Sequence, residues 1–115
     1  MTVRLYGIKH CDKVRAALKF FRDHGIDVIM VDFKKSPVGC DTIDRWLEKV
    51  SIDALFNTRS ATYRNLKLKE LGLDERGKRA WLCKENTLIK RPVVETLSGQ
   101  ILVGFDETIY KEHFS

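Results

Sequence analysis

The chain has 115 residues, of which 43% are hydrophobic and 32% charged, and its formal net charge is +5 at pH 7. This balance indicates one soluble globular domain and excludes a disordered or low-complexity protein. The N-terminal residues lack the features of a signal peptide, and no apolar run approaches the roughly 18 residues of a membrane span, so we expect a cytoplasmic protein without a membrane partner. Basic residues are mixed with acidic ones, which argues against nucleic acid as a partner and for small anionic substrates.

The N-terminal part of the chain predicts a parallel βαβ unit. Val3–Ile8 is a short apolar run typical of a strand, and Asp12–His24 has apolar residues at helical spacing, with Gly25 as its C-terminal cap. Ile26–Val31 is a nearly continuous apolar run, as expected of a strand buried on both faces. A right-handed crossover makes the two strands parallel, and open α/β sheets bind ligands at the carboxyl ends of such strands.

Cys11 lies at this carboxyl end, just before the predicted helix. The N–H groups of a first helical turn have no partner and the helix dipole is positive there, so a thiolate is favoured. Four cationic candidates lie within a few residues: Lys9, His10, Lys13 and Arg15. We therefore interpret Cys11 as a candidate nucleophile. Placement alone leaves open the alternative of a buried structural thiol, because free cysteines are among the most buried residues.

The middle of the chain predicts helices. The Ser36–Gly39 stretch interrupts the pattern, and helical periodicity then extends from Asp41 to about Asn86. It falls into stretches over residues 41–50, 52–56, 63–71 and 74–84. We interpret about residues 36–88 as a helical insertion packed on the α/β body.

The C-terminal part predicts a hairpin and a closing helix. Thr87–Pro92 is expected to be extended, because a residue before proline is pushed away from helix. Val93–Leu97 and Gln100–Val103 flank a Ser-Gly turn, which indicates an antiparallel pair of strands. Asp106 can cap a last helix. The predicted order is βα, β, helices, ββα, an α/β fold with a mixed four-stranded sheet.

The cysteine count of three, with wide spacing, fits neither a disulfide scaffold nor a zinc motif. We therefore expect reduced thiols, as is usual in the cytosol. Cys83 is predicted to be buried on an insertion helix and Cys40 to be a bystander near a turn. Either one could resolve an intermediate on Cys11 if folding brings their Cα atoms within about 7 Å.

The predicted order of elements is the plan of the thioredoxin fold, and four blocks of sequence narrow the resemblance. The blocks are Tyr6–Asp12, Leu55–Ser60 with Tyr63-Arg64, Leu88–Val93, and Leu102–Phe105 ahead of Tyr110. Together they resemble the arsenate reductase (ArsC) family, particularly its ArsC/Spx/YffB-like branch, in the same order and nearly end to end. The resemblance implies one ArsC-like domain over residues 1–115, thioredoxin-like, with the helical insertion between the second and third strands.

The resemblance also implies a site. Cys11 corresponds to the family's catalytic nucleophile, and Arg59 and Arg91 are expected to hold an oxyanion beside it, since arginine offers a planar, permanently charged fork. Arg15 and His10 are further candidates for anion binding. Pro92 corresponds to a proline that is usually cis and faces the cysteine. No metal or bound cofactor is expected.

Two departures from the family pattern bear on the activity. Leu102–Phe105 contains no arginine where arsenate reductases of this type bring a third one, and Val14 stands where Spx-type regulators have a second cysteine. We expect a glutathione-dependent thiol oxidoreductase that reduces a disulfide or an oxyanion such as arsenate through Cys11. Glutathione would be its co-substrate and glutaredoxin a candidate partner. The alternative is a non-catalytic, Spx-like regulator that binds RNA polymerase or another protein.

Overall fold

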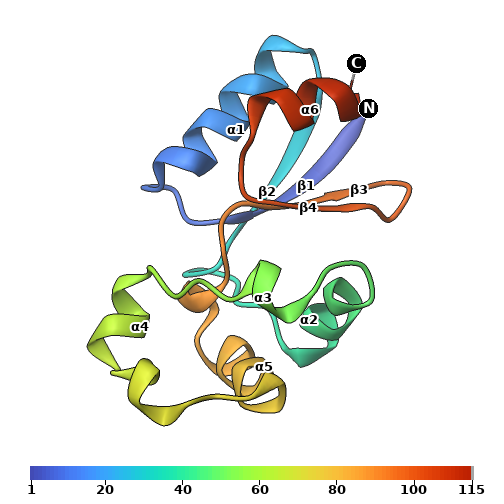
Figure 1. The fold of residues 1–115 in the computed structure, drawn as a ribbon. Helices are drawn as coiled ribbons and strands as arrows, with labels where there is room; N and C mark the ends of the chain where they lie inside the picture. The colour runs from blue at the N-terminus through green and yellow to red at the C-terminus, as the bar shows by residue number, and fades with distance from the viewer. Residues whose placement is uncertain (115) are drawn as a thin grey trace. The chain divides into compact units, whose positions relative to one another are not determined.

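The computed structural model describes residues 1–114, and the chain forms two compact units. The first, which we call the sheet unit, comprises Met1–Lys35 and the chain from Arg91 onward. The second, the helical unit, comprises Ser36–Lys90 and carries the helices drawn from green to orange in Figure 1. Within the described residues, no helix has both the length and the apolar character needed to cross a membrane.

Four strands form one mixed sheet in the sheet unit, in the order β2-β1-β3-β4. Their bounds are Thr2–Gly7 (β1), Asp27–Asp32 (β2), Val93–Thr96 (β3) and Ile101–Val103 (β4). β1 pairs in parallel with β2 and antiparallel with β3, which forms a hairpin with β4. The parallel pair and the hairpin predicted from the apolar runs are confirmed, with strand ends shifted by about one residue. The expectation that the second strand is buried on both faces is wrong: β2 is an edge strand, none of its residues is fully buried, and Ile29 is 50% exposed.

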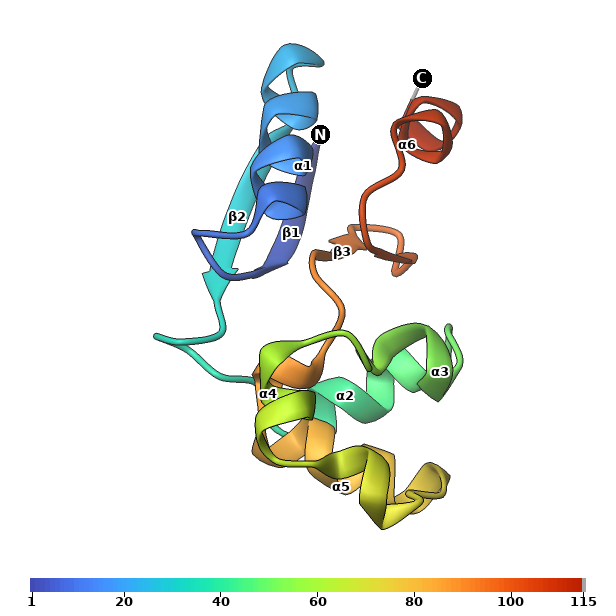
Figure 2. The ribbon, with the colours of Figure 1, turned by 60° about the vertical axis from the view of Figure 1, so that its left-hand side comes forward.

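Two helices, α1 (Asp12–Asp23) and α6 (Glu107–Phe114), pack on the same face of this sheet (Figures 1 and 2). Val3 and Leu5 alternate along β1 and so point to one face, where both are almost fully buried. The other buried members of this core are Val14, Ala17, Phe20, Phe21, Ile26, Val94 and Tyr110. The apolar stripe predicted for the first helix is therefore its core-facing side.

Hydrogen bonds made by Asp106, Tyr110 and Gly104 hold the link from β4 to α6. Asp106 accepts a hydrogen bond from the Ile109 N–H at 3.2 Å, which confirms the predicted cap. The buried Tyr110 hydroxyl donates to the Gly104 carbonyl at 2.7 Å, and the Gly104 N–H donates to the Pro92 carbonyl at 2.7 Å. Burial raises the pKa of Tyr110, so its hydroxyl stays protonated and remains a donor.

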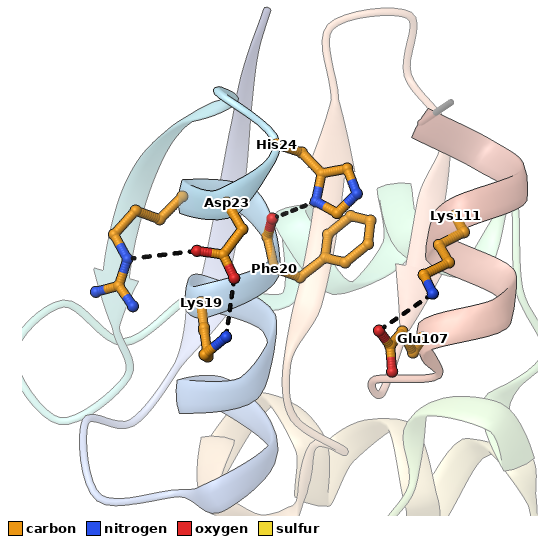
Figure 3. A network of polar contacts seen from close by, with 7 residues as sticks. Lys19, Phe20, Asp23, His24, Glu107 and Lys111 are labelled. Carbon is orange, nitrogen blue, oxygen red and sulfur yellow. Dashed lines mark hydrogen bonds and ion pairs between the residues drawn. The ribbon is translucent and has the colours of Figure 1, made fainter.

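The C-terminal end of α1 is closed by His24 (Figure 3). Its Nδ1 lies 2.8 Å from the Phe20 carbonyl oxygen, and its ring stacks on the Phe20 ring with centroids 4.0 Å apart. Gly25 follows with φ +68°, a conformation that glycine adopts at low cost, so the predicted cap is confirmed. The exposed ion pair of Lys19 with Asp23 lies beside this end, and a second exposed pair, Lys111 with Glu107, joins the first two turns of α6.

Replacing His24 with alanine should lower the free energy of unfolding by about 1 kcal/mol, because the helix end loses a hydrogen bond and an aromatic contact. Chemical denaturation at neutral pH would measure this loss. The exposed His10 is the control, since His10→Ala should change stability by less than about 0.5 kcal/mol. Equal effects of the two substitutions would contradict the role given to His24.

The helical unit contains four short α-helices and two 3₁₀ turns. These are α2 (Cys40–Leu47), α3 (Ile52–Leu55), α4 (Ala61–Asn65), η1 (Leu68–Leu71), α5 (Glu75–Lys84) and η2 (Asn86–Leu88). Side-chain caps at Ser51, Ser60 and Asp74 start α3, α4 and α5 by accepting hydrogen bonds from N–H groups three residues later. The predicted first, second and fourth helical stretches are confirmed.

The continuous helix predicted over residues 63–71 is wrong. α4 ends at Asn65, Lys67 adopts a left-handed conformation with φ 54°, and η1 follows as a separate turn. Leu68 is buried, whereas Leu66 and Leu71 are 45% and 57% exposed. The apolar residues therefore do not share one buried stripe that would hold a single helix together.

The extended conformation predicted for Thr87–Pro92 is only partly correct. Asn86–Leu88 forms the η2 turn, and the backbone becomes extended at Ile89, with φ −77° and ψ 133°. Ile89 makes an isolated antiparallel bridge with Phe56. The η2 turn forms because the buried Asn86 side chain is anchored to the backbone of Val38, a tertiary contact that a rule about the residue before proline does not include.

Cys40 and Cys83 are joined by a disulfide, with Cα atoms 5.1 Å apart. The expectation of reduced thiols is therefore wrong for this pair. Cys40 is bonded to Cys83 and is not a bystander, and Cys83 is partly exposed, not buried. The physical reason is that packing brings α2 and α5 together, although the two cysteines are 43 residues apart in sequence.

Candidate active site

Cys11 is the N-cap residue of α1, as the sequence predicts. Its backbone is extended, with φ −107° and ψ 125°, and its carbonyl oxygen accepts the first helical hydrogen bond from the Arg15 N–H at 3.0 Å. Its side chain makes no capping hydrogen bond, is only partly buried, and packs against the edge of the core. The thiol thus sits at the positive end of a helix dipole and remains open to solvent on one side.

Gly7 sets the distance between the end of β1 and the first turn of α1. A Cβ atom on Gly7 would lie 2.6 Å from Cγ2 of Val14, a side chain that is completely buried. Only glycine allows this approach without displacing Val14, which is a stiff, β-branched residue. Sequence reasoning missed this role, although the Tyr6-Gly7 pair belongs to the first block of the resemblance.

Replacing Gly7 with alanine should destabilise the protein by about 2 kcal/mol, because the new methyl group overpacks a filled core. Thermal or urea unfolding would measure the loss. Gly39→Ala is the control, since no atom lies within 4 Å of a Cβ built there. The same substitution made in a Val14→Ala protein should cost far less than in the wild type, and an unchanged cost would contradict the steric explanation.

Arg91 and Pro92 lie in the sheet unit at the start of β3. The Arg91-Pro92 bond is cis, as the resemblance implies. Tyr6 of β1 pairs with Val93 of β3, and this antiparallel register, continued by one residue, places Pro92 beside Gly7. Arg91 and Pro92 therefore lie at the end of the sheet where β1 leads into the loop carrying Cys11.

His10 and Arg15 also belong to the sheet unit, and both are exposed. Arg15 forms an ion pair with Asp12 in the first turn of α1, at 3.4 Å. An exposed pair of this kind is weak and exchanges readily with solvent, so it leaves the guanidinium accessible to an anion. An anion that binds Arg15 therefore has to compete with the carboxylate of Asp12.

Arg59 belongs to the helical unit, and its backbone is held at both ends while its side chain is exposed. The Arg59 N–H donates to Oδ1 of Asn57 at 3.0 Å, and its carbonyl accepts from the Arg64 guanidinium at 2.9 Å. Ser60, which is 6% exposed, then caps α4 by accepting a hydrogen bond from the Tyr63 N–H. This loop therefore presents a charged side chain on a constrained backbone.

The η2 turn supports the same loop. The Asn57 N–H donates to the Leu88 carbonyl at 2.8 Å, and the hydroxyl groups of Thr62 and Thr87 lie 2.7 Å apart. The supporting roles of Asn57 and Arg64 were not deduced from the sequence. Asparagine two residues before Arg59 is the one signal available, because this side chain often bonds the N–H two positions on.

Within residues 1–114, no group of three or more histidine, cysteine or acidic side chains is arranged to hold a metal ion. The candidate residues predicted from the sequence are one thiol, one proline and several cationic side chains. Cys11, His10, Arg15, Arg91 and Pro92 are carried by the sheet unit, and Arg59 by the helical unit.

Comparison with known proteins identifies the family of this chain. The family model described as ArsC matches residues 6–113, which is nearly the whole chain. The protein belongs to the ArsC family. The mixed sheet with a helical insertion is the thioredoxin-like fold that the resemblance implies, and that prediction is confirmed.

Individual relatives cover nearly the full chain. An uncharacterized protein of Haemophilus influenzae is 34% identical over 114 residues, covering 98% of this chain and 99% of its own. The solved structure of a YFFB protein is 29% identical, with a TM-score of 0.89, and covers 98% of this chain and 99% of its own. An arsenate reductase (ArsC) related protein from Brucella melitensis is 34% identical, with a TM-score of 0.77, and covers 100% of this chain and 96% of its own.

Proposed function

We propose that this ArsC-family protein is a thiol oxidoreductase in which Cys11 is the nucleophile and glutathione the co-substrate. The proposal rests on the state of Cys11, which is the cysteine of residues 1–114 that is not in a disulfide. It occupies the N-cap position of α1, and its side chain makes no capping hydrogen bond. Cys40 and Cys83 are already bonded to each other. This arrangement supports a reaction that uses a single protein thiol and takes the second thiol from solution.

The preferred substrate class is a mixed disulfide of glutathione. The Cys11 thiolate attacks the glutathione sulfur, the substrate leaves as a thiolate that takes up a proton, and Cys11 becomes glutathionylated. A second glutathione thiolate then attacks that adduct, which releases Cys11 and forms glutathione disulfide. Over the two steps, the mixed disulfide and one free glutathione become the reduced substrate thiol and glutathione disulfide, and the cytoplasmic thiol pool supplies the free glutathione.

Arginine side chains are proposed to bind the anionic groups of the substrate. Arg91 is favoured because it directly precedes β3, at the end of the sheet where β1 leads into the Cys11 loop. Arg59 is favoured because its backbone is constrained and its side chain is exposed. Guanidinium groups bind carboxylates and oxyanions by paired hydrogen bonds. His10 and Arg15 have supporting roles in this proposal, Arg15 after it leaves Asp12.

Arsenate is the second substrate to screen. Two of the similar structures are an arsenate reductase related protein of Brucella melitensis and a possible arsenate reductase of Streptococcus mutans, the latter 29% identical with a TM-score of 0.79 over 96% of both chains. These relatives support a reductase. We place a disulfide substrate ahead of arsenate because Leu102–Phe105 lacks the third arginine that arsenate reductases of this type bring to their substrate.

The test is glutathionylation of the protein by glutathione disulfide, followed by mass spectrometry of the modified peptide. We expect the adduct on Cys11, forming about tenfold more slowly in Arg59→Ala and Arg91→Ala, because each loses a charged hydrogen-bond donor. Arg22→Ala is the matched control, since Arg22 is exposed at the far end of α1. An unmodified Cys11, or equal rates in all variants, would contradict the proposed site.

A further inference from the structure

The Cys40–Cys83 disulfide lies in the helical unit and joins the first turn of α2 to the last turn of α5. Both cysteines are partly exposed, so small molecules in solution have access to this part of the surface. Nothing in the proposed reaction of Cys11 uses this pair. Its role therefore has to be argued from its own surroundings.

A buried asparagine holds the same two segments together. Asn86, 8% exposed, follows α5, and its Nδ2 donates to the carbonyl groups of Leu82 at 3.0 Å and Val38 at 3.1 Å. Its Oδ1 accepts from the Val38 N–H at 2.6 Å. Val38 is two residues before Cys40, and Leu82 directly precedes Cys83. The asparagine thus fixes the chain next to each cysteine without involving either sulfur.

An ion pair forms a second tie between the same helices. Arg79 of α5 donates to both carboxylate oxygens of Asp44 of α2, at 2.6 and 2.7 Å. These hydrogen bonds keep the pKa of Asp44 below its usual value, so the pair stays charged at neutral pH. The neighbouring Lys78 pairs instead with Asp53 of α3, at 2.9 Å. Two adjacent residues of α5 therefore form ion pairs with different helices. The Arg79 pair joins α5 to α2, the helix to which the disulfide also links it, and the Lys78 pair joins α5 to α3.

We propose that Cys40 and Cys83 form a second thiol–disulfide exchange site, which small thiols reduce and small disulfides reoxidise while the helical unit stays folded. This inference does not depend on the function proposed for Cys11. The ties through Asn86 and Arg79 keep the two thiols close after reduction. A high effective concentration of one thiol next to the other then favours closure of the ring over two separate mixed disulfides.

Reduction of this disulfide needs no reductant other than small thiols. One thiolate attacks a sulfur of the pair, the protein S–S bond breaks, and a mixed disulfide forms while the other cysteine leaves as a thiolate. A second small thiolate attacks the outer sulfur of the mixed disulfide and releases the second cysteine. Two small thiols become one disulfide and the protein pair gains two electrons and two protons. Reoxidation by a small disulfide such as glutathione disulfide is the reverse.

The experiment uses the full chain carrying Cys11→Ser, so that the proposed nucleophile cannot mediate the exchange. Oxidised and reduced samples are incubated at several ratios of glutathione to glutathione disulfide, trapped with an alkylating agent, and analysed by peptide mass spectrometry. We expect both samples to converge on the same fraction of disulfide at each ratio. Circular dichroism should show that the reduced protein keeps its helical content.

Variants test the ties. Arg79→Gln should lower the equilibrium constant for disulfide formation about threefold, within the range of an exposed ion pair, and Lys78→Gln, the matched control, should leave it unchanged. Asn86→Ala should lower the constant about tenfold. The proposal is overturned if the disulfide resists glutathione until the protein is unfolded, if reduction unfolds the helical unit, or if the Lys78 and Arg79 variants behave alike.

Discussion

Cys11→Ser is expected to lower glutathione-dependent reduction of a mixed disulfide by a factor on the order of 10³ or more, because the serine hydroxyl is not ionised at neutral pH and cannot carry the reaction. While the Cys40–Cys83 disulfide is intact, Cys11 is the cysteine available as the nucleophile for this reaction. The rate would be measured with the mixed disulfide of glutathione and 2-mercaptoethanol, by following formation of glutathione disulfide.

Serine is nearly isosteric with cysteine, so the variant should retain its fold and its unfolding midpoint. A Cys40→Ser, Cys83→Ser double variant is the matched control, and its turnover should stay within a few-fold of the wild type. Unchanged turnover in Cys11→Ser would remove Cys11 from the mechanism. A wild type that is inactive toward disulfides and arsenate would instead favour the non-catalytic, partner-binding alternative.

Asn86→Asp is expected to lower the free energy of unfolding by about 3 kcal/mol at neutral pH. The substitution removes both hydrogen bonds donated by Nδ2 and places a negative charge against the carbonyl oxygens of Val38 and Leu82. Urea unfolding, with the disulfide intact, would measure the loss. Asn65→Asp is the matched control, because Asn65 is exposed at the end of α4, and its effect should stay below about 0.5 kcal/mol.

The pH dependence of this loss identifies its cause. Burial should raise the pKa of the introduced carboxyl in the folded state above its unfolded value of about 4. The penalty relative to the wild type should therefore be smallest below about pH 4, grow as pH rises through the unfolded value, and level off above the folded one. A neutral-pH penalty below about 1 kcal/mol would contradict the role given to Asn86.

The sequence by itself determined the features that depend on neighbours along the chain. Apolar spacing predicted β1, α1 and β2, and local capping chemistry predicted the ends at Gly25 and Asp106, because helix ends and strand periods are set within a few residues. The position of Cys11 at the start of α1 follows from the same local pattern. The catalytic role of Cys11 and the anion-binding roles of Arg59 and Arg91 stay predictions.

Only the tertiary structure decided the contacts between distant segments. The Cys40–Cys83 bond and the anchoring of Val38 by Asn86 join residues 43 and 48 positions apart, and no periodic pattern encodes such a distance. The break near Lys67 likewise depends on which leucines find a buried partner, since helical spacing alone favours a single helix there. Local rules describe each element, whereas the pairing of elements depends on the whole packed core.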